Sequence, residues 1–134
     1  MKLVDAYTEH GAMPLLYDLL AERPAEANIS HRKMPALVEH ARFFASRPYT
    51  EWYLIEVDGE YVGAIYLTVD DEIGVSIFKS YWGRGYAPAA ISLLMKAHPR
   101  ERYLANVAPG NARSARMFQC LGFKALQHTY ELRP

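Results

Sequence analysis

Residues 72–90 read EIGVSIFKSYWGRGYAPAA, and this stretch joins a β-strand pattern to a helix pattern through a glycine turn. Residues 72–78 are rich in β-branched and aromatic residues, which predicts a strand. From Gly85 onward the apolar residues recur at helical spacing, which predicts a helix that ends at His98-Pro99. The stretch therefore predicts a strand–turn–helix unit.

The turn Gly83-Arg84-Gly85 lies just before the first turn of that helix, whose N–H groups have no intrahelical partners. Those donors and the positive end of the helix dipole form an anion site. Glycine lets the backbone adopt positive φ and come close to a phosphate, and Arg84 adds charge at the rim. The turn therefore predicts a phosphate site, with a turn that only joins strand to helix as the alternative.

The patterns around this unit predict one α/β domain, residues 1–134, with a mixed sheet of about six strands and about four flanking helices. The turn Asp58-Gly59 between two β-rich runs predicts a hairpin. Asn111 is a good N-cap, and Gly122 a natural C-cap, for the last helix. The expected strands are 3–8, 51–57, 60–69, 72–78, 103–107 and 123–132, and the expected helices are 11–22, 35–46, 85–98 and 111–121.

The composition excludes several classes of partner. Fifteen basic residues balance fifteen acidic ones, which argues against recognition of nucleic acid through its phosphates. Cys120 is the only cysteine, so the chain cannot form an internal disulfide and a reducing, cytoplasmic compartment is expected. No apolar run approaches the ~18 residues of a membrane span. The five histidines and the cysteine lack metal-ligand spacing, so no metal is expected.

Two motifs resemble those of the GNAT superfamily of N-acetyltransferases. Residues 82–87, Trp-Gly-Arg-Gly-Tyr-Ala, resemble the family signature Gln/Arg-x-x-Gly-x-Gly/Ala, with Trp82 at the first position. Residues 111–123 resemble the family block Asn-x-x-Ser-x-x-x-Tyr/Phe-x-x-x-Gly-Phe. The resemblance is strongest from about residue 51 to the end, and it is closest to the branch of ribosomal-protein and amino-sugar acetyltransferases.

The resemblance implies acetyl-CoA as the cofactor. It places the pyrophosphate on backbone N–H groups of the turn and the pantetheine arm beside the backbone of Ser76 and Ile77, where strands 72–78 and 103–107 splay apart. It also makes Asn111 a catalytic residue that hydrogen-bonds the arm, for which a plain helix N-cap is the alternative. The implied cofactor residues are Ser76, Ile77, Trp82, Gly83, Arg84, Gly85, Tyr86, Ala87, Asn111, Ser114 and Phe118.

The family's catalytic positions are only partly filled. The frequent general-acid tyrosine falls at Phe118, and a glutamate used by one protein-acetylating branch falls near Asn106. Departure of an unprotonated thiolate costs on the order of 2 kcal/mol at neutral pH, so Phe118 slows the reaction without forbidding it. Glu72, which opens a central strand, is the first candidate for the base, and a solvated strand-end carboxylate is its alternative. Glu51 is the second candidate.

The acceptor site is the least patterned part of the chain. Its candidates are Glu51, Trp52, Tyr53 and His31, and His40 lies in the same region. For the aromatic candidates Trp52 and Tyr53, the alternative is that the side chain packs in the core. The leading hypothesis is acetylation of a primary amine on a small molecule such as an amino-sugar nucleotide. The alternatives are acetylation of a protein N-terminus or lysine, and a non-catalytic acyl-CoA-binding module. A homodimer is expected by analogy with the family.

Overall fold

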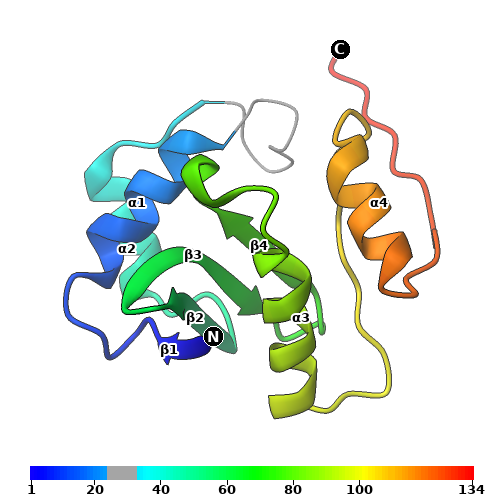
Figure 1. The fold of residues 1–134 in the computed structure, drawn as a ribbon. Coiled ribbons are helices and arrows are strands. Elements are labelled where there is room, and N and C mark those ends of the chain that lie inside the picture. The colour runs from blue at the N-terminus through cyan, green and yellow to red at the C-terminus, as the bar shows by residue number, and fades with distance from the viewer. Residues whose placement is uncertain (24–32) are drawn as a thin grey trace.

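The computed structural model describes residues 1–23 and 33–134. Its sheet has four antiparallel strands in the order β1-β2-β3-β4 (Figure 1). The strands are β1 (Lys2–Asp5), β2 (Glu51–Val57), β3 (Glu60–Leu67) and β4 (Ile73–Ile77). The helices are α1 (Ala12–Glu22), α2 (Leu37–Ala45), α3 (Tyr86–Ala97) and α4 (Ala112–Cys120), and a 3₁₀ turn spans Lys79–Tyr81. The α/β class and the four predicted helices are confirmed.

Helices cover both faces of this sheet. Because side chains alternate along a strand, β2 sends Leu54 to the face under α1 and α2 and Ile55 to the face under α3. Leu16 and Leu19 of α1 fill the first face, and Ile91 of α3 fills the second, all of them buried. The sheet therefore separates two apolar clusters and carries a different helix layer on each side (Figure 1).

The predicted strand at 103–107 is reduced to one parallel bridge between Glu72 and Leu104. Two hydrogen bonds hold it, from Ile73 N–H to Leu104 O at 2.8 Å and from Leu104 N–H to Asp71 O at 2.9 Å. Beyond Leu104 the chain leaves the sheet on its way to α4 (Figure 1). The edge of β4 after Ile73 is therefore not covered by a neighbouring strand in the described part of the chain.

The predicted last strand, 123–132, is not a strand. Figure 1 shows this segment beyond α4, on the side away from the sheet, and Leu126, Tyr130 and Leu132 are exposed. With no edge beside it, a β-rich sequence has nothing to pair with. The described sheet therefore has four strands and not the expected six or so. None of the described helices has the length and apolar character needed to cross a bilayer.

Two glycines let β3 and β4 lie close together, and they are constrained differently. A Cβ at Gly63 would lie 2.2 Å from the carbonyl oxygen of Ser76, which is backbone. A Cβ at Gly74 would lie 2.0 Å from Cζ of Tyr66, the side chain of its cross-strand partner. A ring can rotate away from an added methyl group, whereas a paired strand cannot.

We therefore expect Gly63→Ala to lower the free energy of unfolding by more than about 2 kcal/mol, and Gly74→Ala by less. Urea denaturation measures both values. In a Tyr66→Leu background the cost of Gly74→Ala should shrink while that of Gly63→Ala persists. A cost of Gly74→Ala that is the same in the wild-type and Tyr66→Leu backgrounds would contradict this account of the two glycines.

Candidate active site

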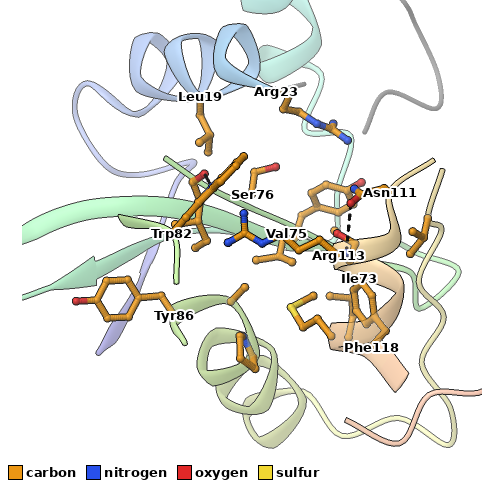
Figure 2. A pocket seen from close by; sticks show the side chains of 18 of the residues that line it. Leu19, Arg23, Ile73, Val75, Ser76, Trp82, Tyr86, Asn111, Arg113 and Phe118 are labelled. Atoms are coloured by element: carbon orange, nitrogen blue, oxygen red, sulfur yellow. Dashed lines mark hydrogen bonds between the residues drawn. The ribbon is translucent and has the colours of Figure 1, made fainter. Parts of the chain in front are cut away.

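A cleft of about 590 Å³ opens along the edge of β4 where the chain after Leu104 diverges. Its walls come from β4, the glycine turn, the start of α3, and α4 (Figure 2). Of the predicted cofactor residues, only Arg84 does not line it. Those that do are Ser76, Ile77, Trp82, Gly83, Gly85, Tyr86, Ala87, Asn111, Ser114 and Phe118.

The free edge of β4 presents the peptide of Val75 to the cleft. Ile73 directs its N–H outward to Leu104, and Ile77 directs its carbonyl outward to Trp82 Nε1 at 2.8 Å. Phe78 directs its N–H inward to β3. Because peptide directions alternate along a strand, Val75 faces outward between them and Ser76 faces β3. The outward-facing peptide next to the predicted position Ser76 is therefore that of Val75, and Ser76 itself lines the cleft.

The glycine turn has the geometry of an anion site. Gly83 and Gly85 have φ of +80° and +77°, and a Cβ at either would meet no atom within 4 Å, so space is open beside the backbone. The first intrahelical hydrogen bond of α3 runs from Ala89 N–H to Gly85 O. The amides of Tyr86 and Ala87 precede it and remain available to a ligand at the positive end of the helix dipole.

Two arginines, Arg23 at the end of α1 and Arg113 in α4, line this cleft. Arg113 was not singled out from the sequence. Its guanidinium carbon lies 4.2 Å from the centroid of the Trp82 ring, and Figure 2 shows the two side chains together at the mouth of the site. Arg84 instead lies over the ring of Tyr81, at 5.5 Å, outside the cleft. The only sequence signal for Arg113 is its place between Asn111 and Ser114, two motif positions in the first turn of α4.

Asn111 and Phe118 hold α4 in place at the cleft. Oδ1 of Asn111 accepts a hydrogen bond from the N–H of Ser114 at 3.2 Å, so the N-cap role is present and the amide nitrogen remains free to donate to a ligand. Phe118 is buried and packs edge-on against Phe123 at 5.1 Å. It therefore shapes the cleft as an apolar wall and has no proton to donate.

Glu72 lies at the end of the cleft near β3. Its Oε2 accepts a hydrogen bond from Asn106 Nδ2 at 2.5 Å, and its Oε1 accepts one from Thr68 Oγ1 at 3.2 Å. A carboxylate has about four acceptor sites, so two remain for another donor. Asn106, at the position where one branch of the family has a catalytic glutamate, thus orients the carboxylate of Glu72 and cannot itself act as a base.

A second cavity, of about 410 Å³, lies between α1, α2 and the sheet. It meets the cleft at the residues that line both, which are Leu19, Arg23, Tyr49, Tyr66 and residues 74–76. The rings of Tyr49 and Tyr66 stack in parallel with centroids 3.8 Å apart. Burial raises the pKa of the Tyr49 phenol well above its ordinary value, and the nearby Tyr66 adds to the effect. Tyr49 therefore stays protonated at neutral pH and can donate.

The predicted acceptor residues are separated by the sheet. Trp52 lines the second cavity, whereas Glu51 and Tyr53 line neither cavity. The hydroxyl group of Tyr53 donates a hydrogen bond to Glu51 Oε2 at 3.0 Å. The same hydroxyl oxygen lies 2.7 Å from Nε2 of His98, on the α3 side of the sheet. Burial and this contact with Glu51 raise the pKa of Tyr53 to about 12. The remaining candidate, His31, lies outside the described residues.

His40 lies in the wall of the second cavity between α1 and α2. The residue is 5% exposed, and its ring packs against Tyr17 at 5.2 Å. Burial lowers the pKa of His40, opposed by a hydrogen bond to the Met13 backbone, so the ring is neutral at pH 7. Its Nε2 has no hydrogen-bond partner among the described residues. A buried acceptor left unpaired costs about 1–3 kcal/mol.

The model of the GNAT acetyltransferase domain matches residues 7–124. The chain belongs to the GNAT acetyltransferase family. As a member of it, the chain is an N-acetyltransferase, and the resemblance seen in the two sequence motifs is confirmed. No curated protein sequence matches the chain.

Solved GNAT structures share this fold at low sequence identity. A spermidine N-acetyltransferase chimera of Vibrio cholerae SpeG and hSSAT has a TM-score of 0.74 at 15% identity, over 96% of this chain and 84% of that one. A ribosomal-protein-alanine N-acetyltransferase from Brucella melitensis has 0.71 at 17%, over 92% and 85%. The acetyltransferase yncA from Salmonella typhimurium, solved with its cofactor acetyl-CoA, has 0.69 at 16%, over 92% and 80%.

The positions of the two arginines predict different effects on cofactor binding. We expect Arg113→Gln to weaken binding of CoA roughly tenfold, because its guanidinium lies in the cleft beside Trp82, where it can pair with a phosphate, whereas that of Arg84 lies over Tyr81 outside the cleft. Arg84→Gln is the matched control and should weaken binding less. Isothermal titration at two salt concentrations measures both. A larger loss in the Arg84 variant would contradict the assignment.

Proposed function

We propose that the chain transfers the acetyl group of acetyl-CoA to a primary amine on a small molecule. One observation carries the proposal: the cleft along the free edge of β4 reaches the glycine turn at one end and joins a second, largely apolar cavity beside residues 74–76. A site for an activated donor and a site for an acceptor are thus adjacent.

The residues present fit acetyl-CoA. The amides of residues 83–87 would hold its pyrophosphate, with Arg113 at the rim. The outward C=O of Val75 would accept a hydrogen bond from an amide N–H of the pantetheine arm, as an added strand pairs with a sheet edge. The amide nitrogen of Asn111 would add a further donor.

When bound, acetyl-CoA supplies an acetyl group activated as a thioester. The N–H of Val75 is placed to stabilise negative charge that develops on the acetyl oxygen. An alkylamine is protonated at neutral pH, and its deprotonation costs roughly 4–5 kcal/mol without a base. Glu72, held by Asn106 and Thr68, is the base we propose. Tyr49, which stays protonated, can donate the proton that the departing thiolate needs.

The aromatic walls of the second cavity favour a small acceptor over a protein. Acetylation of a protein terminus or lysine predicts an open groove beside β4, whereas this cavity lies under α1 and α2 and is walled by aromatic side chains. Within small molecules, the phenylalanine form of the second motif suggests an amino-sugar nucleotide. A non-catalytic acyl-CoA-binding module is the alternative that Phe118 leaves open.

Release of free thiol from acetyl-CoA, measured against amino-sugar nucleotides, alkylamines, diamines and peptides, tests the proposal. Turnover with a small amine, and little with peptides, is expected. Tight cofactor binding without turnover on any acceptor would support the non-catalytic alternative, and absence of cofactor binding would refute the proposal altogether.

The base is tested by two glutamates of the sheet. Glu72→Gln should lower kcat by roughly 10²-fold or more, because the variant keeps the size of the side chain but loses the proton acceptor. Glu51→Gln is the control, since Glu51 lines neither cavity, and kcat should stay within about twofold. A similar kcat in the two variants would remove Glu72 as the base.

A further inference from the structure

The second cavity has two chemically different ends. At one end residues 74–76 of β4 join it to the cleft, which is where an amine must lie to react. At the other end are Glu39 and His40 of α2. Most of the remaining wall is apolar or aromatic and includes Leu16, Leu20, Phe43 and Trp52, and Arg23, which lines the cleft as well, is its one cation among the described residues. An occupant that fills the cavity thus needs an apolar middle.

His40 supplies a hydrogen-bond acceptor at the α2 end. One ring nitrogen is engaged by the backbone of Met13 on α1, and Nε2 is the nitrogen without a partner in the described chain. In a neutral imidazole with its proton on Nδ1, Nε2 carries a lone pair and can only accept. Buried polar atoms in native proteins are nearly always paired, so this lone pair indicates a donor that arrives with a ligand.

We infer that the acceptor spans this cavity, with its reacting amine at β4 and an N–H or O–H donor at its far end bonded to His40 Nε2. The inference rests on the proposed function and narrows its substrate class to compact amines with a second donor. The carboxylate of Glu39, at the same end, favours a cationic donor over a neutral one. An amino-sugar nucleotide suits these walls less well than a compact amine, because apart from Arg23 its phosphates would face mostly apolar side chains and the carboxylate of Glu39.

Three amines with the same number of heavy atoms test this directly: pentylamine, aminobutanol and diaminobutane. They differ only in the far end, which is a methyl group, a hydroxyl group or an ammonium group. We expect kcat/KM to be roughly tenfold higher for aminobutanol than for pentylamine, and higher again for diaminobutane, with the difference mostly in KM.

Three variants assign that preference to its source. His40→Phe removes the acceptor and should bring the ratio of aminobutanol to pentylamine close to one, whereas His40→Gln keeps an acceptor and should retain part of the preference. Glu39→Gln should reduce only the advantage of diaminobutane over aminobutanol. A ratio that is unchanged in His40→Phe would overturn the inference, as would a wild-type enzyme that prefers pentylamine.

A binding readout covers the case in which His40→Phe fails to fold. In wild-type protein labelled with ¹⁵N at histidine, the Nε2 resonance of His40 should shift on addition of aminobutanol and less with pentylamine. No shift at saturating aminobutanol would overturn the inference. Turnover of amino-sugar nucleotides without turnover of these three amines would overturn it while the proposed function stood; no turnover of any amine would refute both.

Discussion

The hydrogen bond from Ile73 N–H to the carbonyl of Leu104 marks where two strands stop being neighbours. Up to that point β4 and the chain after α3 are held together, and beyond it they separate. The separation leaves the peptide of Val75 without a strand partner and opens the cleft beside it. Because this edge is accessible from the cleft, it can pair with an extended, amide-bearing ligand.

The glycine turn and the tyrosine pair depend on the same strand. β4 runs into the turn that begins α3, so a ligand along its edge ends at the free amides of Tyr86 and Ala87. On the other face, the absence of a side chain at Gly74 lets the ring of Tyr66 lie against the strand and stack on Tyr49. β4 thus contributes to the walls of both cavities, and the two cavities meet at residues 74–76. A transfer between two substrates requires sites that adjoin in this way.

Local patterns predicted most of this fold, and most of what they missed depends on contacts between distant parts of the chain. The helices, the hairpin and the glycine turn follow from residue spacing alone, and nearly every predicted cofactor residue lines the cleft. Pairing of 103–107 and 123–132 depends on a distant partner, which local pattern does not contain. Likewise, the outward direction of the Val75 peptide depends on the pairing of β4, and the position of Arg113 in the cleft and of Arg84 outside it depends on tertiary contacts such as the ring each guanidinium meets. Glu51 and Tyr53 lie on the opposite face of the sheet from Trp52 because side chains alternate along β2. Alternation alone does not indicate which face carries the second cavity.

The central claim is that β4 and the turn after it form a single site for acetyl-CoA. Backbone amide shifts of ¹⁵N-labelled protein, recorded while CoA is added, test it most directly. The account predicts that the largest changes fall on Val75, Ile77 and residues 83–87, with the amides around α2 little affected. Saturable binding whose shifts are confined to α1 and α2, and leave Val75 and the glycine turn unmoved, would contradict it.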